Sequence, residues 1–382
     1  MRVYSSRILT QLARYKSAKG RNMATTSSLC NSDVILNVQN NKGVITLNRP
    51  KSLNALNLPM IDEIYPVLKQ WNEENLDMII IEGTGSKAFC SGGDVVAVTS
   101  APAHIKGTEK QTEFFKKEYQ LNHLIGTLNI PYIALIDGIT MGGGVGLSVH
   151  GKYRIATEKT LFAMPETGIG LFPDVGGSCF MPKLKGGIGM YLALTGYRLK
   201  GVDCLHAGIA THICKQDELP NLREELLNLS DGKDSEIVAL LNLYDSRFPK
   251  EKFTLQEVIP HIDQCFNMNS VEDILKCLDT VNSPWSKETK EKFKSFSPTS
   301  VKITFEQMVR GKKLSSLKDC LQMEYRLACR CCEDNDFYEG IRALLIDKDK
   351  SPKWQPDSIE KVTQDTINRY FLPLTSDREL KL

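Results

Sequence analysis

Apolar and polar positions follow two different patterns along this chain of 382 residues. In its first half, short apolar runs of strand length are separated by segments whose apolar residues recur at helical spacing. The clearest strands are predicted at residues 34–39, 43–48, 78–81 and 132–136, and the clearest helix at residues 112–128. This repeated succession of strand, loop and helix predicts an α/β fold.

The pattern changes near residue 215, beyond which strand signals fade and helical spacing dominates. Further helices are predicted there, at residues 218–228, 235–243, 271–281, 301–309, 317–332 and 337–345. We therefore expect three parts, namely a leader over residues 1–30, an α/β core over 31–214 and a mostly helical region over 215–382.

The leader differs from the rest of the chain in its charge. Residues 1–32 hold six basic residues and no acid, so the net charge of +2 leaves −4 on residues 33–382. The leader is also rich in serine and weakly amphipathic, a composition typical of a mitochondrial transit peptide. A disordered tail is the alternative. The acidic balance of the body argues against nucleic-acid binding, and the lack of a run of 18 apolar residues argues against membrane insertion.

Eleven cysteines are scattered along the chain. The odd number and the length of the chain disfavour a disulfide framework. Cys329, Cys331 and Cys332 cluster within a helical pattern, with no second cysteine pair at ligand spacing and no nearby histidine. We therefore expect reduced, packed thiols and no metal site.

Two glycine-rich bends carry the chemistry that the sequence suggests. The first, AFCSGGD at residues 88–94, and the second, MGGGVG at residues 141–146, each follow a strand-like run. Glycine lets the backbone approach a ligand closely, and free N–H groups at a helix start attract negative charge. Two such donors from separate turns can form an oxyanion hole for acyl transfer.

These two bends, together with a Pro-Glu pair at residues 165–166 and PDVGG at residues 173–177, resemble the crotonase (enoyl-CoA hydratase/isomerase) superfamily. The resemblance implies a spiral of ββα units followed by a helical C-terminal region. Within the superfamily, FAMPETGIGLFPDVGG at residues 162–177 and SPTSVKIT at residues 297–304 are similar to enzymes that hydrolyse short 3-hydroxyacyl-CoA thioesters.

The resemblance also implies site residues. It places the oxyanion donors at Gly93 and Gly143, and the catalytic carboxylates at Glu166 and Asp174. Glu118 matches a glutamate that contacts the substrate, for which a surface ion pair is the alternative. Because apolar residues surround Glu166 in the sequence, burial should raise its pKa and suit it to act as a base or a nucleophile. The sequence does not distinguish these two roles.

The superfamily resemblance allows more than one activity. Hydratases use a second glutamate two residues after the glycine triplet, where this chain has Gly146, and they commonly lack the carboxylate found here at Asp174. This exchange favours thioester hydrolysis over water addition to a double bond. The resemblance to the hydrolysing enzymes then implies a role in valine breakdown in the mitochondrial matrix, with 3-hydroxyisobutyryl or 3-hydroxypropionyl as the acyl group. The implied partner is an acyl-CoA substrate, and no cofactor is expected. The alternatives are an enoyl-CoA hydratase or isomerase and a non-enzymatic RNA-binding relative; oligomeric state stays open.

Overall fold

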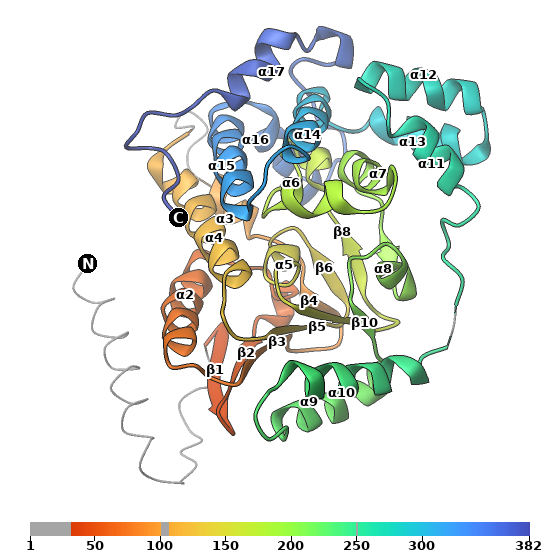
Figure 1. Cartoon of the computed structure of the whole chain (residues 1–382). Helices are drawn as coiled ribbons and strands as arrows, with labels where there is room; N and C mark the ends of the chain where they lie inside the picture. Colours follow the sequence, from red (N-terminus) through yellow and green to blue (C-terminus); the bar gives the residue numbers. More distant parts are fainter. Residues whose placement is uncertain (1–31, 101–106, 250) are drawn as a thin grey trace.

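The computed structural model describes residues 32–100, 107–249 and 251–382, and the predicted leader at residues 1–30 lies outside this part (Figure 1). Two β-sheets form the first half of the described chain. The larger sheet has the strand order β1-β2-β3-β5-β7-β10, with bounds Val34–Gln39, Lys42–Leu47, Met78–Gly83, Tyr132–Ile136, Tyr153–Ala156 and His212–Ile213. Only β1 pairs antiparallel, with β2, and the other neighbours are parallel.

The smaller sheet has the order β4-β6-β8-β9, with bounds Ala88–Cys90, Ile139–Met141, Leu161–Ala163 and Leu199–Lys200. Each of β3, β5 and β7 in the larger sheet is followed along the chain by a strand of the smaller sheet and then by a helix. This is the spiral of ββα units that the resemblance implied, so the predicted fold class is confirmed.

Helices of the first half fill the space beside and between the sheets. They are α2 to α8, with bounds Leu58–Glu73, Val95–Thr99, Glu109–Gly126, Gly143–Gly146, Gly177–Phe180, Ile188–Thr195 and Val202–His206. The α2 helix begins where the Asn57 side chain accepts a hydrogen bond from Met60 N–H, and it buries Ile64 and Trp71. The side-chain cap and the buried face together fix α2 against the core.

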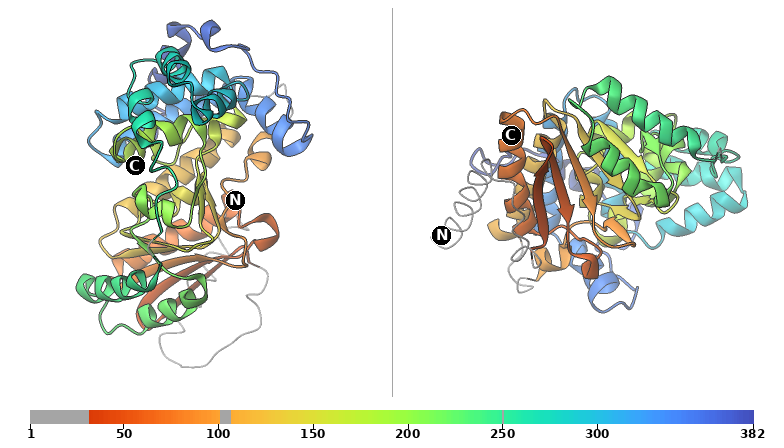
Figure 2. Two further views of the ribbon diagram at one scale, coloured as in Figure 1. Left: turned by 90° about the vertical axis from the view of Figure 1, so that its right-hand side faces the viewer. Right: turned by 90° about the horizontal axis from the view of Figure 1, so that it is seen from below.

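The helical second half packs against the core at two places. Helices α9 and α10, with bounds Leu219–Leu227 and Asp234–Arg247, cover the face of the larger sheet that carries Ile80 and Ile133. The remaining helices gather at the opposite end of the molecule (Figure 2). They are α11 to α17, with bounds Ile259–Cys265, Val271–Val281, Pro284–Phe293, Pro298–Gly311, Leu317–Glu333, Asp336–Ile341 and Gln364–Phe371.

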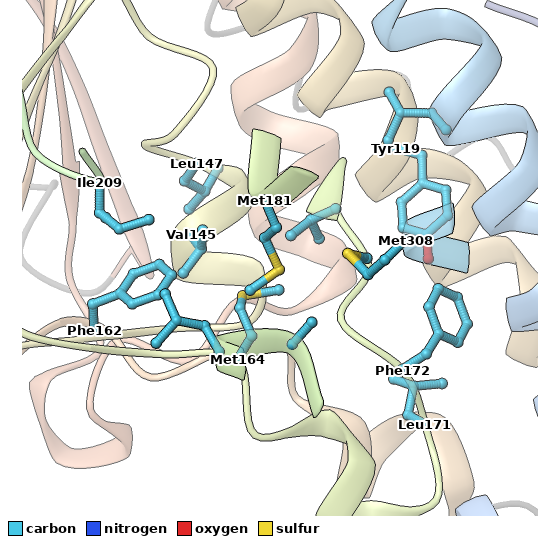
Figure 3. Close-up of a cluster of buried hydrophobic side chains, with 14 of the residues drawn as sticks. Tyr119, Val145, Leu147, Phe162, Met164, Leu171, Phe172, Met181, Ile209 and Met308 are labelled. Carbon is cyan, nitrogen blue, oxygen red and sulfur yellow. The ribbon is translucent and has the colours of Figure 1, made fainter. Parts of the chain in front are cut away.

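One hydrophobic cluster connects the spiral with these later helices. In Figure 3, Met308 of α14 lies beside Tyr119 of α4 and Phe172, while Phe162 and Val145 lie toward the other side of the cluster. All five side chains are buried. The later helices therefore complete the apolar surroundings of the segments that hold the two glycine bends and Glu166.

Candidate active site

The two glycine bends meet in the structure. Gly93 follows β4 and is held by Leu56, whose N–H donates to Gly92 O at 2.8 Å and whose carbonyl accepts from Asp94 N–H at 2.8 Å. Gly143 is the first residue of α5, and a Cβ atom built on it would lie 3.1 Å from the Gly93 nitrogen. In the part of the chain that the structure describes, neither the Gly93 nor the Gly143 N–H donates a hydrogen bond. Two free backbone donors thus lie side by side, as an oxyanion hole requires.

The crowding around α5 explains its glycines. Gly142 has a φ of +45°, a conformation that favours glycine. A Cβ on Gly144 would lie 2.3 Å from the carbonyl oxygen of Cys90. Side chains at these positions would push α5 away from β4 and separate the two N–H donors.

Three acidic side chains lie buried around this pair of donors. Glu118 on α4, Glu166 after β8 and Asp174 have exposed fractions of 2%, 5% and 4%. A carboxylate oxygen of Glu118 would lie 2.5 Å from a Cβ on Gly143, and one of Glu166 would lie 2.8 Å from a Cβ on Gly142. The structure therefore brings the predicted glycines and carboxyl groups to one place.

Burial dominates the electrostatics of these acids. It raises the pKa of Glu118 and of Glu166 well above their usual range, and the charge of Asp174 raises both further. Burial also raises the pKa of Asp174, to about 7. Since all three groups repel one another when ionised, their protons are shared within one coupled group. At neutral pH such a group holds both protonated and ionised carboxyls, as acid–base chemistry needs.

Asp174 has a buried hydrogen-bond donor that sequence reasoning missed. The hydroxyl of Tyr119 on α4 donates to Asp174 Oδ2 at 2.8 Å, and this bond lowers the pKa of Asp174 against the effect of burial. Tyr119 follows Glu118 directly, so one helix supplies an acid to the glycine pair and a donor to Asp174. A tyrosine at an apolar position of a predicted helix does not indicate from the sequence that its hydroxyl donates to Asp174.

A second acid that sequence reasoning missed, Glu324 of α15, holds the turn after Asp174. Its carboxylate accepts hydrogen bonds from Gly176 N–H at 2.7 Å, Ser178 N–H at 2.8 Å and the Ser178 hydroxyl at 2.5 Å. Gln307 of α14 donates to Glu324 at 3.3 Å and to the carbonyl of Pro173 at 2.7 Å. Two helices of the C-terminal region thus fix the chain on both sides of Asp174.

The turn between these anchors adopts a strained conformation. Val175 has a φ of +51°, which is rare for a β-branched residue and costs roughly 1–3 kcal/mol. Its carbonyl oxygen accepts a hydrogen bond from Nε2 of His150 at 2.7 Å. His150 and Glu324 together stabilise a backbone shape that the local sequence would not keep by itself.

Other sequence expectations concern groups outside this cluster. The Asp94 side chain accepts a hydrogen bond from Ala97 N–H at 3.4 Å and so caps the start of α3. Cys329, Cys331 and Cys332 are buried, unbridged thiols within α15. Over the described ranges, no group of three or more His, Cys, Asp or Glu is arranged to hold a metal ion. Across the same ranges, no helix is both long and apolar enough to span a membrane.

Comparisons with known proteins match nearly the whole described chain. The profile of the enoyl-CoA hydratase/isomerase family matches residues 42–371. A Gallus gallus protein named 3-hydroxyisobutyryl-CoA hydrolase, mitochondrial, is 50% identical over 355 residues, which cover 92% of this chain and 91% of that protein. The Homo sapiens protein of the same name is 49% identical over 349 residues, covering 90% and 89%. The crystal structure of a carnitinyl-CoA dehydratase from Mycobacterium thermoresistibile has a TM-score of 0.83 at 35% identity, covering 92% of this chain and 99% of that one.

Proposed function

Because the chain belongs to the enoyl-CoA hydratase/isomerase family, we propose that the cluster around Gly93 and Gly143 is its active site and hydrolyses the thioester of 3-hydroxyisobutyryl-CoA. The observation that carries the proposal is the meeting of two free N–H donors with buried carboxyl groups. The products are 3-hydroxyisobutyrate and free CoA. The reaction takes place in mitochondria, in keeping with the names of the curated relatives, and the family resemblance assigns it to valine breakdown.

The glycine pair acts on the thioester carbonyl. Gly93 and Gly143 N–H groups donate to the carbonyl oxygen and stabilise the negative charge that develops when the carbon is attacked. Since the backbone of α5 and of the first bend is fixed by packing, the donors need no rearrangement in the transition state. One such donor is typically worth about 3 kcal/mol of transition-state stabilisation.

Glu166 and Asp174 deliver the oxygen that replaces sulfur. In one route, ionised Glu166 takes a proton from a water molecule as its oxygen attacks the carbonyl carbon. In the other, the Glu166 carboxylate attacks directly, forming a mixed anhydride that water then opens. In both routes the C–S bond breaks. In the first route the departing CoA thiolate takes up the proton that Glu166 removed from water. In the second route it takes up a proton released by the water that opens the anhydride. Asp174, held by Tyr119, orients the water or passes the proton.

Hydration of an enoyl-CoA is the competing activity, because the similar Mycobacterium protein is named a dehydratase. Adding water across a double bond requires an acid and a base on the two reacting carbons. Gly146 stands where hydratases of this family carry their second glutamate, and glycine supplies no such group. Thiol release from a hydroxyacyl-CoA, compared with absorbance loss from an enoyl-CoA, separates the two activities.

A thiol-release assay with short acyl-CoA esters tests the proposal. The wild-type protein should hydrolyse 3-hydroxyisobutyryl-CoA, while Glu166→Gln and Asp174→Asn should each lose about 10²- to 10⁴-fold in kcat. Asp203→Asn is a matched control, because Asp203 is also buried but accepts hydrogen bonds from Thr254. Full turnover in Glu166→Gln would remove Glu166 from the mechanism.

Oxygen-18 distinguishes the two routes. In a single turnover in labelled water, direct attack by Glu166 forms the anhydride, and water that opens it at the glutamyl carbonyl carbon leaves label in that carboxylate. Label in Glu166 therefore identifies the direct route. Water activation leaves the carboxylate unlabelled and places the label only in the released acid. Mass spectrometry of the peptide containing Glu166 reads out the result.

A further inference from the structure

A buried amide lies at the active site and has no hydrogen-bond partner among the residues that the structure describes. Asn122 is on α4, one helical turn after Glu118, with an exposed fraction of 0%. In the part of the chain described here, neither its Oδ1 nor its Nδ2 atom forms a hydrogen bond. A polar group withdrawn from water without a partner is unfavourable in a folded protein, and such a group near a catalytic centre often meets a ligand.

The neighbours of Asn122 place its amide between two parts of the site. The Nδ2 atom lies 2.7 Å from the point where a Cβ on Gly146 would stand, and the Cβ of Val175 lies 2.8 Å from the same point. Gly146 is in α5, the helix that begins with Gly143, and Val175 follows Asp174. The absence of a side chain at Gly146 is therefore what makes room for the amide.

Asn122 and Glu118 approach the same short helix from α4. A carboxylate oxygen of Glu118 lies against Gly143, and the Asn122 amide lies against Gly146. The same oxygen of Glu118 also has no hydrogen-bond partner among the described residues. The two side chains therefore offer an amide donor, an amide acceptor and a carboxylate acceptor, none of which is used by another residue in the described ranges.

This set of groups suits one part of the substrate. A hydroxyl group accepts one hydrogen bond and donates another. A phosphate would instead need cationic or several N–H donors, and the thioester carbonyl is assigned to the glycine pair. The hydroxyl of a 3-hydroxyacyl chain is neutral and lies two carbons from the carbonyl carbon, so it is the group that an amide beside the oxyanion helix can reach.

We propose that Asn122 binds the 3-hydroxyl group of the acyl chain, with Nδ2–H donating to the hydroxyl oxygen while the hydroxyl donates to Oδ1 or to Glu118. This inference rests on the proposed function and extends it. Asn122 takes no part in bond breaking; it sets the preference for hydroxylated over plain acyl groups. A site built to bind a hydroxyl leaves its own polar groups unpaired with an analogue that lacks it, and so rejects that analogue.

The test compares kcat/KM for 3-hydroxyisobutyryl-CoA and isobutyryl-CoA, which differ only by the hydroxyl. The wild-type protein should prefer the hydroxylated substrate, and Asn122→Ala should lower the ratio of the two values by about tenfold, the effect of one or two neutral hydrogen bonds. Asn122→Ser, which keeps a donor and an acceptor, should recover part of the ratio. Circular dichroism checks that each variant is folded, and because the ratio is taken within one preparation, partial loss of folded protein leaves it unchanged.

Two failures are distinguishable. If the wild-type protein releases thiol from neither substrate, the proposed function is wrong. If the wild-type protein hydrolyses both substrates and the ratio is the same in the wild type, Asn122→Ala and Asn122→Ser, then the amide supports the fold or holds water and does not touch the hydroxyl. Should Asn122→Ala not fold, the ratio in Asn122→Ser decides alone, and an unchanged ratio overturns the proposal.

Discussion

Removal of the Tyr119 hydroxyl should shift the pH dependence of hydrolysis upward. Tyr119 donates to Asp174 Oδ2 at 2.8 Å in a fully buried pair, and this bond favours the ionised form of Asp174. In Tyr119→Phe the ionised form loses its donor, so the pKa of Asp174 rises. In both proposed routes Asp174 orients a water molecule by accepting its hydrogen bond, or passes on its proton, and either task needs the ionised form of Asp174. We therefore expect the rising limb of the profile of kcat against pH to move to higher pH.

The size of the shift follows from the hydrogen bond. A buried hydrogen bond to a charged group is worth about 1.5–3 kcal/mol, and about 1.36 kcal/mol corresponds to one pKa unit, so the limb should move by about one to two units. With the wild-type pKa of Asp174 at about 7, the variant should be strongly impaired at neutral pH and should recover at alkaline pH. Rates in the plateau should change less than rates at pH 7.

Thiol release measured from pH 5 to 10 under saturating substrate gives the profile. Tyr244→Phe is the matched control, because the Tyr244 hydroxyl donates to the Glu225 carboxylate at 2.8 Å, between α10 and α9. The control loses the same kind of hydrogen bond away from the site and should keep the wild-type profile. If the rising limb for Tyr119→Phe lies within about 0.3 pH units of the wild-type limb, the role assigned to the Tyr119 hydrogen bond is wrong. Even the weaker end of the energy range predicts a larger shift.

Other changes test the remaining parts of the site. Glu118→Gln should leave the same pH limb in place, in contrast to Tyr119→Phe, because the charge of Asp174 raises the pKa of Glu118, so that Asp174 ionises before Glu118; a shift of about one unit would contradict this order of ionisation. Gly143→Ala should lower kcat by about 10²- to 10³-fold, because the new Cβ would lie 2.5 Å from a carboxylate oxygen of Glu118. Gly168→Ala is the control, since its Cβ would meet only Phe296, at 3.7 Å. An equal loss of kcat in both variants would show a general folding defect. Glu324→Gln places an NH₂ group among three N–H and O–H donors and should lower the free energy of unfolding by about 1–3 kcal/mol. Urea titration measures that loss, and an unchanged midpoint would mean that Glu324 does not stabilise the turn.

The sequence predicted those parts of the site that are local in the chain. Glycine bends after strands and Glu166 within an apolar run can be recognised from a few neighbouring residues, and the resemblance supplied their roles. The partners of Asp174 could not be found in this way. Tyr119 precedes it by 55 residues and Glu324 follows Ser178 by 146, and only the packing of α4 and α15 brings them together. Nothing in the sequence around Glu324 distinguishes it from a solvent-facing helix residue.

The fold shows the same division between local and long-range information. The strand predicted at residues 34–39 and the helix at residues 271–281 agree with β1 and α12, because each has a clear apolar period and a turn or cap beside it. The prediction did not include α13, which spans Pro284–Phe293 and consists largely of charged and polar residues. The helix begins where the Ser283 side chain accepts a hydrogen bond from Ser286 N–H. Its few buried side chains gain their contacts only from neighbouring helices.

The distance in sequence between Asp174 and its supports has a consequence for biosynthesis. The acceptor for Gly176 N–H is Glu324, which lies 148 positions downstream. Most of the polypeptide must therefore be synthesised before this turn can adopt its folded conformation. A nascent chain that ends before α15 would contain every glycine and acid assigned to bond cleavage. It would lack Glu324, however, so the turn that positions Asp174 would not be fixed. Hydrolysis therefore requires that translation has passed α15. A prematurely terminated chain should not hydrolyse thioesters, even if its two β-sheets have formed.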